Sequence, residues 1–241
     1  WVETASFGFG THEQMAGAMT AIAREGLVSE CFAMDPVLTA QRMKRAGLAQ
    51  DLKAVKGVIT SARGLAAGLK EAAKVALAGR DFLEHAPYSM HVGTEGRTQA
   101  SVTDSLAEVR RIVAAHGGSE VENTVPKVLR GMPFVPMSSA IGPSGERWLP
   151  VHALVPLSDA ADAWSAVRAL FDARRADLDR LGVQIGVLTA IVGSNAFVLE
   201  PVFYWPAPRT LYYQRVLDEA TRARFEDFPP SPQAEALVME L

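Results

Sequence analysis

The stretch Val183–Tyr204, VQIGVLTAIVGSNAFVLEPVFY, decides the fold class. It contains two apolar runs, Val183–Val192 and Phe197–Tyr204, separated by the four residues GSNA. Glycine and asparagine tolerate the positive φ angles that tight hairpin turns require, so this pattern predicts a β-hairpin. Because a hairpin joins antiparallel strands, the stretch favours a largely antiparallel sheet over the alternative of a doubly wound parallel sheet.

A strand, a helix and a second strand are predicted at the start of the chain. Ala5–Phe9 alternates with the period of two of a strand, and Thr11 followed by Gln14 forms a capping-box pattern. Apolar residues then recur at helical spacing as far as Gly26, which predicts the end of the helix. Ser29–Met34 predicts the returning strand, which completes one strand–helix–strand unit.

The same order of signals occurs in a second unit. Tyr88–Val92 predicts a strand, and the apolar stripe over Val102–Val113 predicts a helix. The pair Gly117-Gly118 ends this helix, and Ser119–Glu122 predicts the returning strand. The second unit therefore repeats the first.

A third unit leads into the hairpin. Trp148–Leu157 predicts one strand, Ser158 is expected to cap a helix whose apolar face runs to Phe171, and Gly182 ends that helix. Three such units predict an α+β domain with a ferredoxin-like, split βαβ arrangement. The sheet is expected to be largely antiparallel, with the helices packed on one face.

Four segments fall outside these units. Ala62–Ala78 is rich in alanine, lysine and leucine and predicts an inserted helix, whereas Pro126–Gly145 is rich in proline and glycine and predicts a long loop. Arg209–Arg224 predicts one polar helix, and Phe228–Pro232 is expected to be extended.

The composition excludes several classes of protein. The 241 residues are 49% hydrophobic, with 27 acidic and 24 basic side chains, which is typical of a globular protein and excludes disorder. The near-neutral charge argues against binding to nucleic acid, and no apolar run approaches the roughly 20 residues of a membrane-spanning helix. The single Cys31 suits a reducing compartment, so we expect a cytoplasmic location. The first residues show no signal peptide, and we expect a segment of a longer protein, because the chain begins with Trp1 and stops abruptly at Leu241.

A partial nucleotide-binding motif occurs at the first strand end. Gly8-Phe9-Gly10 precedes a predicted helix, but the position of the third glycine is held by Glu13, whose charge would repel a pyrophosphate. We therefore interpret this segment as a strand that turns into a capped helix.

The five histidines are the first candidates for acid–base chemistry. His12 and His116 fall in the first and last turns of predicted helices, where a structural role is favoured. His85 lies in a loop, and His91 on an apolar strand is interpreted as a satisfied structural histidine. His152 lies between a proline-rich loop and a polar helix start, and is the histidine that we select as a candidate catalytic residue.

Polar and aromatic residues concentrate beside three apolar segments and are expected to line a pocket. Arg130 offers a bidentate fork for a carboxylate, and Tyr204 and Trp205 offer aromatic walls. Asn123 and Glu200 complete the set of predicted substrate-binding residues. The alternative interpretation is a solvated arginine and the turn chemistry of the Glu-Pro and Trp-Pro pairs.

The same residues carry a family resemblance. Glu120–Pro133, Gly142–His152 and Glu200–Pro206 resemble the C-terminal domain of FAD-linked oxidases of the vanillyl-alcohol oxidase and p-cresol methylhydroxylase superfamily. The nearest branch is the flavin-dependent D-lactate dehydrogenase and glycolate oxidase type. Ala5–Pro36 is similar to the segment that follows the flavin-binding domain, so the resemblance covers residues 1–241 as one cap domain.

The resemblance implies a cofactor and partners. An N-terminal domain of the same chain would bind FAD, and the cap would cover the flavin and supply the substrate pocket. A small-molecule substrate would pass a hydride to the flavin, and an electron acceptor would reoxidise it. We expect no activity from this segment alone, and homo-oligomers are compatible with the resemblance.

The resemblance also bears on metal binding. The hydroxy-acid branch carries a divalent metal on a loop with two histidines and a Gly-Asp-Gly-Asn run, and the matching place here is Val151–Leu157. His152 stands in that segment, but the second histidine and the Gly-Asp-Gly-Asn run do not. No metal site is therefore predicted.

Two substrate classes and two other functions remain open. For a 2-hydroxy acid such as D-lactate or glycolate, Arg130 would hold the carboxylate and His152 would accept the hydroxyl proton. For a para-substituted phenol, Tyr204 and Trp205 would wall the ring. The alternatives are a non-catalytic binding or assembly module, and a domain that binds a small regulatory ligand.

Overall fold

A computed structural model of the chain describes residues 1–45, 86–121, 125–126, 134 and 140–241. Within these residues, eight strands form one sheet in the order β4-β1-β3-β2-β7-β8-β5, and β6 also pairs with β8. Every pair is antiparallel, which confirms the predicted sheet type. The strands are β1 (Val2–Phe9), β2 (Glu30–Met34), β3 (Tyr88–Glu95), β4 (Ser119–Glu120), β5 (Arg147–Pro150), β6 (Ala153–Pro156), β7 (Gln184–Val192) and β8 (Ala196–Trp205).

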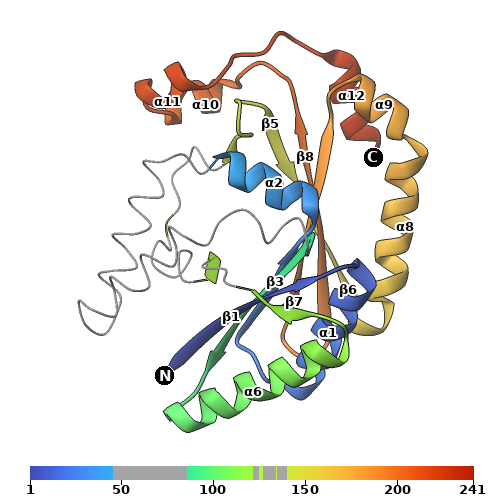
Figure 1. The fold of residues 1–241 in the computed structure, drawn as a ribbon. Helices are drawn as coiled ribbons and strands as arrows, with labels where there is room; N and C mark the ends of the chain where they lie inside the picture. Colours follow the sequence, from blue (N-terminus) through green and yellow to red (C-terminus); the bar gives the residue numbers. More distant parts are fainter. Residues whose placement is uncertain (46–85, 122–124, 127–133, 135–139) are drawn as a thin grey trace.

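Helices cover the sheet unequally (Figure 1). Side chains of α1 and α6 pack with the sheet in the largest apolar cluster, and Trp164 of α8 packs on Val187 and Leu199 of the same face. The opposite face carries α2, whose Leu38 packs with Val202 and Tyr204. The described helices are α1 (His12–Glu25), α2 (Pro36–Arg45), α6 (Gln99–Ala115), α8 (Ala160–Ala173), α9 (Arg175–Arg180), α10 (Leu211–Val216), α11 (Glu219–Arg224) and α12 (Pro232–Glu240).

The alternation of β-strands explains this division of the sheet. Odd-numbered residues of β7 and β8 face α8, whereas even-numbered ones face α2, because successive side chains in a strand point to opposite faces. Close approach of α2 depends on Gly186 of β7, where a Cβ would lie 2.7 Å from the backbone of Leu38. The α+β class is confirmed, with α2 added on the second face.

Local signals in the first unit agree with the structure. Thr11 caps α1: its side chain accepts a hydrogen bond from the Gln14 backbone N–H, and the Gln14 side chain accepts one from the Thr11 N–H. Gly26 ends the helix in the left-handed conformation, with φ of 62°. Gly193 has the same φ of 62° in the turn between β7 and β8, so the predicted hairpin is also confirmed.

The prediction of one continuous strand over Trp148–Leu157 is wrong. The structure divides it into β5 and β6, which both pair with β8 and are separated by Val151 and His152. The predicted cap is also wrong, because a short 3-10 turn, Leu157–Asp159, precedes α8 and the Ser158 hydroxyl donates to the Asp159 carboxylate instead.

The C-terminal part differs from the prediction in two ways. The single polar helix over Arg209–Arg224 is two short helices, α10 and α11, because Leu217 is extended and Asp218 begins a new helix as its N-cap. After the extended segment, α12 begins at Pro232 and was not predicted. The helix predicted at Ala62–Ala78 and most of the loop predicted at Pro126–Gly145 lie outside the described residues.

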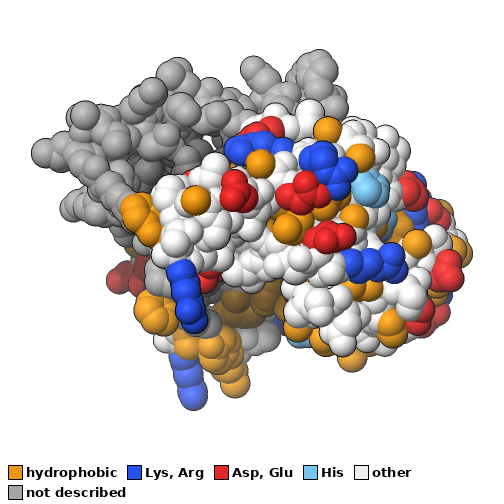
Figure 2. All heavy atoms as spheres, turned by 90° about the horizontal axis from the view of Figure 1, so that it is seen from below, with side chains coloured by type: hydrophobic (Ala, Val, Ile, Leu, Met, Phe, Trp, Pro, Cys, Tyr) orange, Lys and Arg blue, Asp and Glu red, His pale blue; other side chains and the backbone are white. Residues whose placement is uncertain are grey.

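The surface seen in Figure 2 carries basic and acidic side chains side by side, without a broad patch of one sign. This agrees with the small net charge of the sequence, −3. None of the helices in the described ranges is both long and apolar enough to cross a membrane.

Candidate functional site

The break between β5 and β6 places His152 at the edge of the sheet. The Val151 N–H still donates to the carbonyl of Pro201 on β8, at 2.9 Å, so the chain stays attached to the sheet through the break. The His152 side chain is 57% exposed. The predicted catalytic histidine is therefore accessible and lies on a fixed backbone.

His152 contacts Glu200, another residue selected from the sequence. Its Nδ1 lies 3.4 Å from Oε2 of Glu200, whose side chain is 22% exposed. At this distance the Glu200 carboxylate can stabilise a positive charge on the imidazole of His152. The pair therefore combines an accessible imidazole with a nearby, partly buried carboxylate.

An apolar cavity of about 370 Å³ lies beside His152. It is formed by the break in the β5–β6 segment, by the second half of α8, by β8 and by the end of α12. A cavity of this size and polarity is typical of a site for a small ligand with an apolar body. Its other lining residues are Leu149, Val151, Ala153, Val167, Leu170, Phe171, Leu199, Pro201, Phe203, Val238, Met239 and Leu241.

The other predicted binding residues are placed elsewhere. Tyr204 is buried below α2 with Met34 and Leu38. Trp205 is buried on the opposite face of the sheet, and the Cζ atom of Arg147 lies 5.6 Å from the centroid of its ring. Neither of them lines the cavity beside His152, and Glu200, although it contacts His152, is not among the lining residues either. Asn123 and Arg130 lie outside the described residues, and their roles stay predictions.

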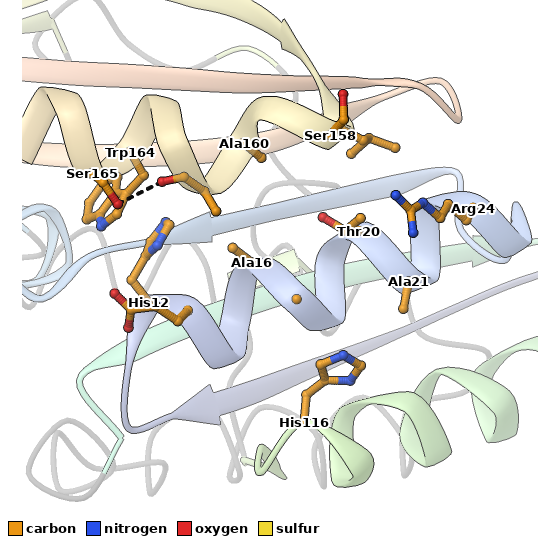
Figure 3. A pocket seen from close by; sticks show the side chains of 14 residues that line it. His12, Ala16, Thr20, Ala21, Arg24, His116, Ser158, Ala160, Trp164 and Ser165 are labelled. Carbon is orange, nitrogen blue, oxygen red and sulfur yellow. Dashed lines mark hydrogen bonds between the residues drawn. The ribbon is translucent and has the colours of Figure 1, made fainter.

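A second cavity, of about 440 Å³, lies between α1 and the start of α8 (Figure 3). At one end the rings of His12 and Trp164 are stacked, with centroids 3.7 Å apart. Burial lowers the pKa of His12 from 6.5 to about 4, so its imidazole is neutral at pH 7. The sequence marks His12 only as a first-turn residue. Its contact with Trp164 depends on packing between distant helices, which no local signal shows.

A third cavity, of about 220 Å³, shares Trp164 with the second and is also lined by Asp35, Tyr88 and Arg168. Burial raises the pKa of Asp35 to about 6, although its carboxylate accepts a 2.7 Å hydrogen bond from the Leu38 N–H. Burial also raises the pKa of Tyr88. Asp35 begins α2 and has a structural role as its cap.

The N-terminus of α1, which follows the partial glycine motif, is unsuited to the pyrophosphate of a dinucleotide. The N-terminus of α1 is closed by the capping box of Thr11 and Gln14, and Glu13 adds a negative charge there. A Cβ on Gly8 would lie 2.3 Å from that of Ala86, so this glycine serves close packing. No three His, Cys, Asp or Glu side chains in the described ranges converge as metal ligands.

Comparison with known proteins gives a likeness in fold. No protein-family model matches the sequence, and no curated protein does. Two solved structures of alkyldihydroxyacetonephosphate synthase match with TM-scores of 0.55 and 0.56, each at 14% identity, over 100% and 85% of this chain. A 4-ethylphenol oxidase from Gulosibacter chungangensis, in an isoeugenol complex, covers 85% of this chain at 8% identity, with a TM-score of 0.44.

The chain spans less than two fifths of each of these proteins, 38%, 36% and 39%. They are FAD-linked oxidases of the vanillyl-alcohol oxidase and p-cresol methylhydroxylase superfamily. The two matches to alkyldihydroxyacetonephosphate synthase show that this chain shares their fold, and the predicted resemblance agrees with the structure at the level of fold.

Proposed function

We propose that this chain is the substrate-binding cap of an FAD-dependent oxidoreductase and that His152 is its base. The observation that carries the proposal is the contact of His152 with Glu200 beside an apolar cavity of about 370 Å³. The fold likeness supports the class of enzyme, and the free, buried thiol of Cys31 supports a cytoplasmic location.

In this proposal the substrate carries a hydroxyl group, which is on the oxidised carbon in a 2-hydroxy acid and on the ring in a para-substituted phenol. The apolar body of the substrate would occupy the cavity, and its hydroxyl would face Nε2 of His152. His152 would accept the hydroxyl proton, and Glu200 would stabilise the imidazolium that forms. FAD, held by a separate domain of the same protein, would supply the hydride acceptor.

Two substrate classes fit this arrangement. A 2-hydroxy acid such as D-lactate or glycolate follows from the sequence resemblance and needs a cation for its carboxylate, for which Arg130 is the proposed residue. A para-substituted phenol is the second candidate, and the nearly complete apolar lining around Phe171 and Phe203 favours it. The alternative to both is a cap without catalytic function that binds a partner or an electron acceptor.

The test uses the complete native protein, purified with its visible spectrum recorded. We expect a flavin band that bleaches under anaerobic conditions with D-lactate, glycolate or p-cresol, and the substrate that bleaches it identifies the class. A protein without flavin absorbance would contradict the proposed class of enzyme.

The base is tested with His152→Gln. We expect flavin content to be unchanged and the rate of flavin reduction to fall by about 10²- to 10⁴-fold, because removal of a general base has effects of this size. Glu200→Gln should lower the rate less, since it removes only the orienting charge. Arg111→Gln is the matched control, because Arg111 is exposed on α6 and pairs with Glu108. An unchanged rate in His152→Gln would exclude the base assignment.

A further inference from the structure

The cavity between α1 and α8, hereafter the α1–α8 groove, shares no lining residue with the cavity beside His152. Figure 3 shows that the two helices run in opposite directions along it, with Trp164 near His12 at one end and Ser158 toward Arg24 at the other. Its volume of about 440 Å³ lies within the range of small-molecule sites.

Small side chains keep the α1–α8 groove open. Ala16 and Gly17 of α1 face Ala160 and Ala161 of α8 across it. A Cβ on Gly17 would lie 2.9 Å from Cδ2 of His116, so the end of α6 closes one side of the space. The central part of the groove is therefore apolar and bounded by three helices.

One end of the groove has polar atoms without partners. His12 and Trp164 are 2% and 6% exposed, and both line the groove. Neither Nε2 of His12 nor Nε1 of Trp164 has a hydrogen-bond partner in the described structure. Buried polar groups are nearly always paired, so a water molecule or a polar group of a ligand would satisfy these two atoms.

The opposite end has an unpaired cation. The side chain of Arg24 is exposed and makes no hydrogen bond or ion pair with any described residue. Side chains of a helix point toward its N-terminus, and Figure 3 shows the guanidinium of Arg24 directed back along the groove toward Thr20. Thr20 and Ser158 line the same end, where the Ser158 hydroxyl is engaged by the Asp159 carboxylate.

The charges favour one orientation of a ligand. Arg24 favours an anion at its own end, whereas at the His12 end the positive charge of Arg168, which acts on both His12 and Glu13, is offset by the Glu13 carboxylate. We propose that the α1–α8 groove binds a small carboxylic acid with a flat apolar body, its carboxylate held by Arg24 and its body lying on the alanines toward the His12–Trp164 pair.

The probes are 3-phenylpropionate, its uncharged amide and the cationic 3-phenylpropylamine, each titrated into the complete native protein. Binding is measured by calorimetry and by the ¹⁵N–¹H signal of the Trp164 indole, assigned with Trp164→Phe. We expect saturable binding of the carboxylate, weaker binding of the amide and none of the amine, with a shift of the Trp164 signal. Absence of saturable binding by the carboxylate would overturn the proposal.

Two variants at exposed positions separate the charge from the space. Arg24→Gln should weaken binding of the carboxylate at least tenfold and leave the amide unchanged, because a charge-assisted hydrogen bond is lost. Ala161→Leu should weaken both by filling the groove. Arg111→Gln, outside the groove, should change neither. Binding of the carboxylate that is the same in Arg24→Gln and Ala161→Leu as in the unaltered protein would place the probe elsewhere and overturn the assignment.

Discussion

Ser6 and His91 are directly opposite each other in the β1–β3 pair, and the Ser6 Oγ lies 2.9 Å from Nδ1 of His91. Both side chains are on the sheet face opposite α1 and α6, because their neighbours Ala5, Phe7 and Met90 belong to the cluster below those helices. His91 is fully buried, and its Nε2 has no hydrogen-bond partner in the described structure. Ser6 therefore provides a partner for Nδ1 of His91. The burial of the ring, with no partner for Nε2, opposes its protonation.

This arrangement predicts a loss of stability in acid. Burial lowers the pKa of His91 from 6.5 to about 3, so between these values the unfolded chain binds a proton that the native protein does not. The contribution of His91 to the free energy of unfolding should be constant above pH 6.5. Below pH 6.5 it should fall by about 1.4 kcal/mol for each pH unit.

The measurement is urea unfolding of the native protein and of His91→Gln at several pH values between 6.5 and 4. The slope of the free energy of unfolding against pH should be smaller in His91→Gln than in the native protein, by about 1.4 kcal/mol per pH unit. Arg111→Gln, an exposed change on α6, should retain it. Equal slopes in His91→Gln and the native protein would show that His91 is protonated in the fold.

The close approach of α2 to β7 at Gly186 leaves no room for a larger side chain at this position. A Cβ at this position would lie 2.7 Å from the Leu38 Cα and backbone nitrogen, and backbone atoms cannot move aside as a flexible side chain can. Gly186→Ala should therefore lower the free energy of unfolding by about 1–3 kcal/mol. Gly10→Ala is the control, since the nearest atom to its Cβ is the Gln14 side-chain oxygen at 3.5 Å, and a change within about 0.5 kcal/mol is expected. Similar stability of the two variants would mean that α2 shifts freely on the sheet.

Elements with signals close together in the sequence could be predicted well. The capping box of Thr11 and Gln14, the stop at Gly26 and the hairpin turn at Gly193 each depend on a few adjacent residues, and the structure has all three. Asp35 also carries a local signal, because an aspartate before a proline is a common start of a helix. The expectations from the sequence end the first unit with the strand Ser29–Met34 and include no helix directly after it, so they do not contain α2.

The remaining features depend on contacts between distant segments. His152 meets Glu200 because β5 and β6 both pair with β8, and the stack of His12 on Trp164 joins α1 to α8. Hydrophobic periodicity specifies which face of a helix is buried, but not which residue lies opposite. His152 and His12 could therefore be considered as candidates from the sequence. Their contacts with Glu200 and Trp164 could not be predicted from it.

The N-cap of α1 should make a measurable contribution to the free energy of unfolding. Thr11→Ala removes the oxygen that accepts from the Gln14 N–H, and should lower the free energy of unfolding by about 1 kcal/mol. Thr11→Ser keeps the hydroxyl and should stay within a few tenths of a kcal/mol of the native protein. Urea unfolding of the three proteins checks this. A loss in Thr11→Ser as large as in Thr11→Ala would assign the effect to the lost methyl group.

Cys31 predicts a thiol that reacts only after unfolding. It is the single cysteine of the 241 residues and is 4% exposed within the main apolar cluster, and burial raises its pKa from 9.0 to about 12. Since the thiolate is the nucleophile, a shift of this size leaves about a thousand times less of it at pH 8 than in an ordinary cysteine. Ellman's reagent should therefore release no colour from the native chain over minutes, and one equivalent in concentrated urea. Gly186→Ala, which weakens the adjoining strands, should raise the native rate through more frequent opening of the sheet. Rapid reaction of the unaltered chain in native buffer would contradict the burial of β2 between β3 and β7.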